Sequence, residues 1–155
     1  MNSASETERE ADAEPVILLV EDNPADVRLT EEMLRMAGFP HRLQVARDGE
    51  QALQMMRREA GYANLPVPDL VLLDLNLPRI DGREVLRQIK QDTVLRRTPV
   101  LILTTSQAEG DIKACYDAHA NCYLTKPVDI VDFGRLIELI RDFWLGVVRL
   151  PGVLR

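Results

Sequence analysis

Apolar residues recur along the chain in five short runs, which are separated by longer segments of mixed polarity. The runs cover residues 16–20, 42–46, 70–75, 100–104 and 122–125. Short runs that are largely apolar are typical of strands buried on both faces, because a strand with one wet face alternates apolar and polar positions. The pattern therefore predicts five short strands inside a covered sheet.

The segments between these runs have the apolar spacing of amphipathic helices. Asn23 and Asp129 precede two of them, and such side chains accept hydrogen bonds from the free N–H groups of a first helical turn. Pro24 suits a first helical position, and Gly38 suits a helix end. We expect helices at 24–38, 49–60, 82–92, 108–120 and 129–145, and a surface loop at 61–69.

Strands and helices alternate in this prediction, and that order is typical of an α/β fold with a parallel sheet covered on both faces. We expect a doubly wound (βα)5 sheet with the strand order 2-1-3-4-5. The carboxyl ends of parallel strands meet at one edge, and ligands bind there at the point where the strand order reverses. In this order the reversal lies between the first and third strands.

Polar residues stand at the carboxyl ends of four of the five runs. Glu21 and Asp22 follow the first run, Asp74 lies near the end of the third, Thr104 ends the fourth, and Lys126 follows the fifth. Taken singly, each has an ordinary explanation as a helix cap, a strand residue or a solvated lysine. Their occurrence together at one predicted edge favours a shared site, since an unused carboxylate at the end of a buried strand is costly.

Three carboxylates at one site repel one another, at a cost of about 4 kcal/mol for each pair ~4 Å apart with an effective dielectric constant of 20. A bound cation relieves that repulsion, and a few oxygen ligands with room for water suit Mg²⁺. Lys126 would add a second positive charge, and Thr104 would add a hydroxyl. Such surroundings suit a phosphoryl group held on the carboxylate of Asp74 as an acyl phosphate.

These residues resemble the response-regulator receiver family, and the resemblance covers residues 15 to about 145. It implies a flavodoxin-like receiver domain at 15–145 in which Asp74 is the phosphoacceptor. It also implies that Glu21, Asp22, Asp74 and the backbone carbonyl of Asn76 bind Mg²⁺. A protein of this kind is not an enzyme but a signalling protein that assists its own Mg²⁺-dependent phosphorylation and dephosphorylation.

The same resemblance implies roles for three further positions. Thr104 would sense the phosphate, Tyr123 would be the aromatic switch residue, and Lys126-Pro127 would be the family's lysine and its cis-proline. Phosphorylation is then expected to draw Lys126 and Thr104 toward the new group, with Tyr123 following. We also expect Lys126 and Thr104 to lie at a solvent edge and to matter less for stability than for signalling.

Two phrases, "LVEDNPADVRLTEEML" and "GREVLRQIK", are similar to those of the single-domain receivers that partner bacterial phytochromes. The resemblance implies a single-domain response regulator of a two-component phosphorelay, with a sensor histidine kinase of the phytochrome type as its partner. We expect its output to pass through a partner or through self-association.

Two other functions on related folds remain as alternatives. A haloacid-dehalogenase-type phosphatase also uses an aspartate nucleophile after a strand, but it needs a second acid where this chain has Asn76. A flavodoxin-like carrier needs a loop rich in hydroxyls and glycine after the first strand, where this chain has the acidic "EDNPAD". A nucleoside-triphosphate enzyme would need a glycine-rich loop ending in Gly-Lys-Ser/Thr, which the sequence lacks.

Composition narrows the choice of partners and compartment. A net charge of −6 argues against direct binding of nucleic acid or of an acidic membrane. No apolar run approaches the ~20 residues that span a bilayer, and the start lacks an apolar signal core, so we expect a cytoplasmic protein. Residues 1–14 are expected to form a disordered acidic tail. We expect free thiols at Cys115 and Cys122, and surface roles for His41 and His119.

The C-terminal segment is more apolar than one covered sheet requires. The last predicted helix carries apolar residues on more than one face, and residues 146–155 are also mainly apolar. One apolar stripe is enough to cover a sheet, and exposed apolar patches usually mark contact surfaces. We therefore expect a homodimer formed through the last helix and a dimerisation arm at 146–155. The alternative is that this tail folds back onto its own domain.

Overall fold

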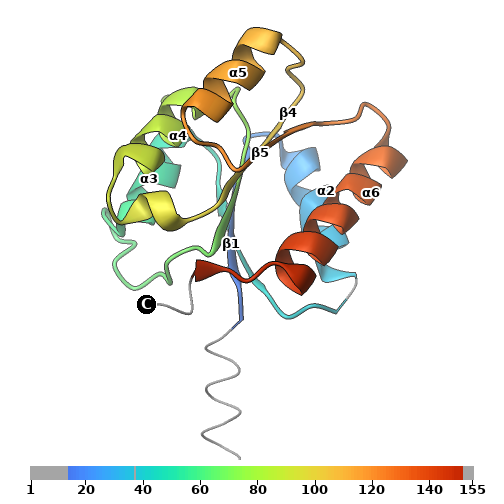
Figure 1. Cartoon of the computed structure of the whole chain (residues 1–155). Helices are drawn as coiled ribbons and strands as arrows, with labels where there is room; N and C mark the ends of the chain where they lie inside the picture. Colours follow the sequence, from blue (N-terminus) through green and yellow to red (C-terminus); the bar gives the residue numbers. More distant parts are fainter. Residues whose placement is uncertain (1–13, 37, 152–155) are drawn as a thin grey trace, which may run out of the picture.

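The computed structural model describes residues 14–36 and 38–151 (Figure 1). Over these residues strands and helices alternate as the sequence predicts. In chain order the elements are β1 (Val16–Val20), α2 (Pro24–Arg35), β2 (Arg42–Ala46), α3 (Gly49–Arg57), β3 (Leu70–Leu73), α4 (Gly82–Gln91), the 3₁₀ helix η1 (Leu95–Arg97), β4 (Val100–Thr104), α5 (Glu109–Asp117), β5 (Cys122–Thr125), α6 (Ile130–Ile140) and the π-helix η2 (Arg141–Val147).

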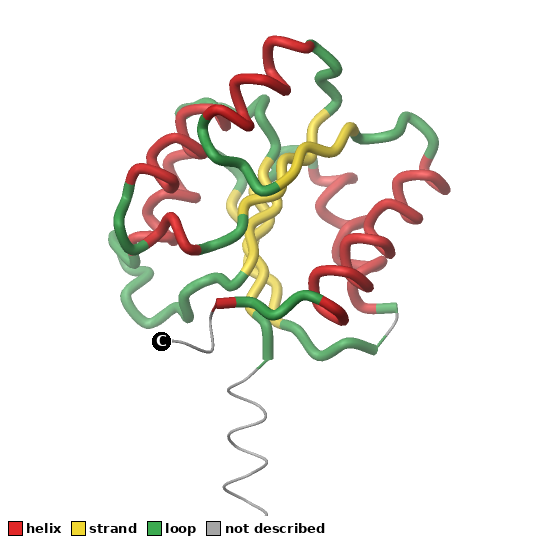
Figure 2. Tube along the Cα trace, viewed as in Figure 1, coloured by secondary structure: helices red, strands yellow, loops and turns green. Residues whose placement is uncertain are grey.

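The strands form one parallel sheet in the order β2-β1-β3-β4-β5, which confirms the predicted α/β doubly wound topology. Helices α3, α4 and α5 cover one face, and α2 and α6 cover the other (Figure 1). Figure 2 shows the resulting three layers, with the twisted sheet between two groups of helices. The strand order reverses between β1 and β3, where a ligand site was expected.

The core consists of two apolar clusters, one on each side of the sheet. Successive strand residues point to opposite faces, so neighbouring side chains enter different clusters. Leu18 and Leu73 pack beneath α3 and α4, whereas Leu19 and Leu72 pack beneath α2 and α6. Each fully buried leucine stabilises the fold by about 1.5–3 kcal/mol. This explains why the central runs are apolar throughout rather than alternating.

The predicted helix starts are confirmed by their caps. The Asn23 side chain accepts hydrogen bonds from the N–H groups of Ala25 and Asp26, and the Asp129 side chain does the same at the start of α6. Some helices end earlier than predicted. The residue after α3, Arg58, adopts the left-handed conformation with a φ of 58°, which ends an α-helix by turning the chain away from its axis.

The end of the chain departs from the predicted helix at 129–145. The α-helix stops at Ile140, and a π-helix continues to Val147. Trp144 and Leu145 pack against the cluster beneath α2 and α6. Gly146 lies against the ring of Phe39, since a Cβ added there would come 3.2 Å from its Cζ atom. Part of the C-terminal segment therefore contacts its own domain.

The two cysteines and the peptide bond before Pro127 were also predicted. Cys115 and Cys122 are free thiols, as expected, and burial raises the pKa of Cys122 to about 11. No described peptide bond is cis. The expected cis bond before Pro127 is therefore wrong, and this bond has the trans form that Xaa-Pro bonds favour by about 0.5–1 kcal/mol.

Residues 1–13 of the predicted tail lie outside the described residues, as do 152–155 of the predicted arm. Among the described residues, no helix has the length and apolar character needed to cross a bilayer.

Two glycines should be essential to the fold because backbone passes directly over them. A Cβ on Gly49 would overlap the carbonyl oxygen of Ile80, and one on Gly82 would overlap that of Asp74. Replacing either glycine by alanine is expected to lower the free energy of unfolding by about 1–3 kcal/mol, measured by urea denaturation. Gly110→Ala is the matched control: it meets open space in α5 and is expected to raise stability by up to about 1 kcal/mol. Equal effects at all three positions would contradict this account.

Candidate functional site

The register of the sheet places two acids side by side at its carboxyl edge. Val20, the last residue of β1, pairs with Leu73, the last residue of β3. Glu21 and Asp74 directly follow these two strands. The backbone N–H of each still donates a hydrogen bond to a neighbouring strand. The Asp74 N–H donates to the carbonyl of Val20 (3.1 Å), and the Glu21 N–H donates to that of Ala46 (2.9 Å).

Glu21, Asp22 and Asp74 form a compact group of carboxylates. Each offers an oxygen within 4.8 Å of the others, and the described residues contain no other such group of acids, histidines or cysteines. Glu21 and Asp74 are buried, whereas Asp22 is exposed. The buried Oε2 atom of Glu21 has no hydrogen-bond partner among the described residues. An all-oxygen set with one unpartnered buried acceptor and one exposed member fits a hard cation such as Mg²⁺.

Asn76, the fourth predicted ligand, lies next to this group. Its backbone N–H donates to Oδ1 of Asp74 at 3.2 Å, and its side chain is exposed. This hydrogen bond helps to orient the Asp74 carboxylate at the end of β3. The backbone of Asn76 is therefore close enough to the acids to belong to the same site.

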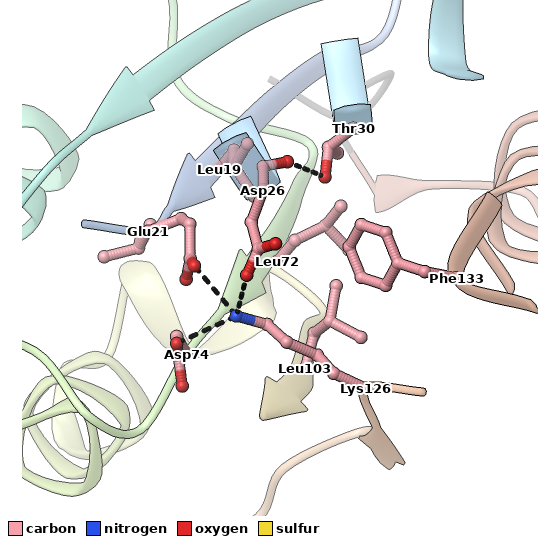
Figure 3. Close-up of a pocket in the computed structure, with 10 residues that line it drawn as sticks. Leu19, Glu21, Asp26, Thr30, Leu72, Asp74, Leu103, Lys126 and Phe133 are labelled. Atoms are coloured by element: carbon pink, nitrogen blue, oxygen red, sulfur yellow. Dashed lines mark hydrogen bonds and ion pairs between the residues drawn. The ribbon is translucent and has the colours of Figure 1, made fainter. Parts of the chain in front are cut away.

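Lys126 reaches the acids from the far side of β4. Its Nζ atom donates to Glu21 (2.8 Å), Asp26 (3.0 Å) and Asp74 (3.0 Å), as Figure 3 shows. These three hydrogen bonds use all three donors of the ammonium group. Asp26 was not among the predicted site residues, because an acid in the first turn of a helix is common and is explained by the helix dipole.

Lys126 and Thr104 do not lie at a solvent edge, and that expectation is wrong. Lys126 is 8% exposed, and Thr104 is fully buried. The lysine stem runs inward along Leu72 and Leu103 to reach the acids (Figure 3). Removing the ammonium would leave buried carboxylates without their counter-charge, which typically costs about 3–5 kcal/mol. Lys126 therefore stabilises the fold as well as supplying charge to the site.

The charged groups of the site shift one another's pKa values. Burial raises the pKa of Glu21 to about 8, and the neighbouring Asp74 carboxylate acts in the same direction. For Asp74, burial is outweighed by Glu21 and Lys126, which together hold its pKa below the usual value. For Lys126, burial is likewise outweighed by the surrounding acids, and its pKa is raised. The proton is therefore held more tightly by Glu21 than by Asp74, and the ammonium form of Lys126 is favoured.

The two predicted switch residues meet at the backbone of Ser106. The Ser106 N–H donates to Oγ1 of Thr104 at 3.4 Å, and the Tyr123 hydroxyl donates to the Ser106 carbonyl at 2.9 Å. Thr104 ends β4 and Tyr123 lies in β5, so the loop after β4 connects them. The structure thus brings the residues at 104 and 123 into contact with one shared neighbour.

An ion-pair network holds the side chain of Ser106. Its hydroxyl donates to Asp111 (2.6 Å), whose carboxylate accepts two hydrogen bonds from Arg83 of α4 (2.9 and 2.8 Å). Arg83, followed by Ser106, lowers the pKa of Asp111 to about 2. No local pattern indicates this network, since Arg83 and Asp111 are 28 residues apart in the chain.

Comparison with known proteins identifies the class of protein that this fold and site define. Residues 17–141 match the response regulator receiver domain family. The chain therefore belongs to this family, and it is a response regulator, a signalling protein.

The chain is similar to phytochrome-associated members of the family. It is 48% identical over 143 residues to the response regulator Rcp1 of Synechocystis sp., which covers 92% of this chain and 97% of Rcp1. A crystal structure of the phosphorylated cyanobacterial phytochrome response regulator RcpA is 48% identical, with a TM-score of 0.87 over 90% of this chain and 99% of RcpA. The Mn²⁺-bound form of Rcp1 has a TM-score of 0.86 at 49% identity, over 88% and 99% of the two chains.

These matches confirm the predicted receiver fold and the resemblance to the phytochrome-associated receivers. They do not favour the phosphatase or the flavodoxin-like carrier. The site agrees with this outcome, because position 76 has an amide where the phosphatase would need an acid.

The pKa of Glu21 predicts how stability depends on pH in the metal-free protein. The folded chain keeps the Glu21 proton up to about pH 8, whereas the unfolded chain releases it near 4.5. The folded state therefore binds more protons between these values, and stability falls as the pH rises through them. Glu21→Gln should remove this contribution, which we expect to exceed about 1 kcal/mol.

The measurement is denaturation by urea in the presence of EDTA at pH 5, 6, 7 and 8. Groups that do not contact Glu21 contribute equally to both proteins, and the pKa values of its neighbours Asp74 and Lys126 are shifted away from this pH range. The difference between wild type and Glu21→Gln therefore reports mainly on Glu21. A wild-type stability that rose relative to the variant over this range would contradict the assignment.

Proposed function

We propose that Asp74 accepts a phosphoryl group from a phosphohistidine of a sensor histidine kinase, and that the chain signals through the resulting change in conformation. The observation that carries this proposal is the position of Asp74. Its carboxylate lies within 4.8 Å of two acids suited to a divalent cation and 3.0 Å from the Lys126 ammonium. The phosphorylated form of RcpA and the Mn²⁺-bound form of Rcp1 support the same chemistry in similar chains.

The transfer is a substitution at phosphorus. An oxygen of Asp74 forms a bond to phosphorus while the phosphorus–nitrogen bond of the donor breaks. The electron pair of that bond stays on the imidazole nitrogen, which then takes up a proton. The lowered pKa keeps Asp74 ionised and therefore nucleophilic. Lys126 can neutralise charge on the phosphoryl oxygens, since its ammonium is already next to the attacking carboxylate.

We infer that the cation is Mg²⁺, held by Glu21, Asp22, Asp74 and the backbone carbonyl of Asn76. When bound, it would supply positive charge beside the transferring group and assist both phosphorylation and dephosphorylation. Glu21 must release its proton to become a ligand. Its unpartnered Oε2 atom supports this role, because a bound cation would satisfy that atom.

In this proposal Thr104 and Tyr123 carry the signal away from Asp74. Once the Thr104 hydroxyl turns toward a phosphoryl group, it releases the N–H of Ser106. The Tyr123 ring can then move into the vacated space and release the Ser106 carbonyl. Both changes act on the loop after β4, so the face formed by α5, β5 and α6 shifts between two populated states.

The similarity to phytochrome response regulators supports a kinase of the phytochrome type as the donor. Its phosphohistidine is formed with ATP, so the proposed location is the cytoplasm. The net charge of −6 supports a protein, rather than a nucleic acid, as the recipient of the signal.

We further propose that a second copy of the chain docks on α6 and η2. Leu139, Phe143 and Val147 are 66%, 53% and 70% exposed. They recur at intervals of four residues, and such residues lie above one another on one face of a helix. Trp144 and Leu145 already cover the chain's own core. The stripe formed by Leu139, Phe143 and Val147 is therefore apolar surface that is not needed to cover this core.

Asp74 is expected to be the phosphoacceptor in a direct test. Incubation with acetyl phosphate and Mg²⁺ should add a phosphoryl group to the wild type and none to Asp74→Asn, as measured by intact mass. Asp117→Asn, which changes an exposed acid at the last residue of α5, is the control and should still be modified. An adduct that persists in Asp74→Asn would contradict the proposal.

Asp22→Asn should weaken Mg²⁺ binding at least about tenfold, because it removes a charged ligand.

The dimer proposal predicts a change in sedimentation. The full chain should sediment as a dimer at tens of micromolar, and the double variant Leu139→Ser, Val147→Ser should sediment as a monomer, because it makes the stripe polar. Val94→Ser removes an equally exposed apolar side chain (68%) from another surface and should leave the dimer intact. A full chain that stays monomeric both with and without a phosphate mimic would exclude this interface.

A further inference from the structure

Asp26 contacts the site but lies outside its candidate metal cluster. Its Oδ2 atom accepts a hydrogen bond from Lys126 at 3.0 Å, whereas the acids that could share a cation are Glu21, Asp22 and Asp74. Two of the lysine's three carboxylate partners are therefore also candidate metal ligands. The third, Asp26, is free of that competing role.

Two hydrogen bonds hold the backbone N–H and carbonyl groups of Asp26 at the start of α2. Its N–H donates to the side chain of Asn23 (3.3 Å), and its carbonyl accepts a hydrogen bond from the hydroxyl of the buried Thr30 (2.7 Å). Asp26 thus projects from the first turn of α2, and Figure 3 shows its carboxylate directed at the lysine. The backbone from which this carboxylate projects is therefore held by hydrogen bonds at the start of α2.

A cation bound by the three clustered acids would change the surroundings of Lys126. Its charge would repel the ammonium over a few ångström, and it would engage Glu21 and Asp74. Lys126 would then keep one of its three carboxylate partners, Asp26. Without that partner, the ammonium at the end of this packed stem would have no carboxylate of its own to hold it beside a divalent ion.

We propose that Asp26 is a positioning residue that keeps the Lys126 ammonium beside Asp74 while Glu21 and Asp74 bind Mg²⁺. This inference rests on the proposed function, since it concerns the same phosphoryl transfer. Lys126 is thereby already in place when the phosphoryl oxygens arrive. Asp26 acts through Lys126 and makes no contact with the transferred group.

The first experiment measures the rate of phosphorylation by acetyl phosphate at saturating Mg²⁺. Asp26→Asn is expected to lower this rate about tenfold, because a misplaced catalytic group costs at least that much. Glu31→Gln removes one exposed negative charge from the same helix and is expected to leave the rate unchanged. An unchanged rate in Asp26→Asn would overturn the inference.

A double-mutant cycle tests whether Asp26 acts through the lysine. In a Lys126→Met background, Asp26→Asn is expected to change the remaining rate less than about twofold. A tenfold loss in that background as well would mean that Asp26 acts independently of Lys126, and would overturn the positioning role.

A second readout is independent of activity and of the Lys126→Met variant. In the metal-free protein, the ¹⁵N signal of the Lys126 side chain is expected to be observable in both wild type and Asp26→Asn, since Glu21 and Asp74 still hold it. On addition of Mg²⁺ the signal should persist in the wild type and disappear in Asp26→Asn. Its persistence in the variant would overturn the inference.

The outcomes separate this inference from the proposed function. Phosphorylation of Asp74→Asn would refute Asp74 as the acceptor. Normal phosphorylation of Asp26→Asn on Asp74, with the lysine signal retained in Mg²⁺, would refute the positioning role alone.

Discussion

The burial of one ammonium group among carboxylates is the constraint on which this site depends. Lys126 and its partners Glu21 and Asp74 would each be costly to bury alone, yet together they satisfy the three donors of the lysine with the help of Asp26. The acids still outnumber the lysine, so Glu21 keeps a proton with a pKa of about 8. A cation bound beside Glu21 would compensate the remaining charge, as the proposed Mg²⁺ site requires.

The fold delivers these groups through the register of the sheet. Because Val20 pairs with Leu73, the residues that follow them in β1 and β3 must be neighbours. The loop after β3 then passes so close to Gly82 that a side chain there would overlap the Asp74 carbonyl. Packing of the strands and the absence of a Cβ therefore set the position of the Asp74 carboxylate, the proposed acceptor, while helices cover both faces of the sheet.

A second polar network lies directly beyond the acids and connects them to the helices. Ser106 bonds Thr104 and Tyr123 through its backbone and Asp111 through its hydroxyl, and Asp111 is bound by Arg83 of α4. In the proposed function, a change at Thr104 would therefore reach α4 and α5 through these hydrogen bonds. This arrangement is consistent with a response regulator, which must convert a local chemical event into a change at its surface.

The sequence by itself determined the fold class and most of the site, because both leave local signals. Apolar runs, caps such as Asn23 and Asp129, and polar residues at strand ends are each recorded within a few neighbouring positions. The tertiary structure decided what depends on distant contacts: the partnership of Asp26 with Lys126, 100 residues apart, the burial of Thr104, and the Arg83–Asp111 pair. In the sequence, an acid in a first helical turn and a lysine after a strand have the ordinary explanation of solvent-exposed charges. The fold brings these two charges together because the start of α2 and the end of β5 lie at the same edge of the sheet.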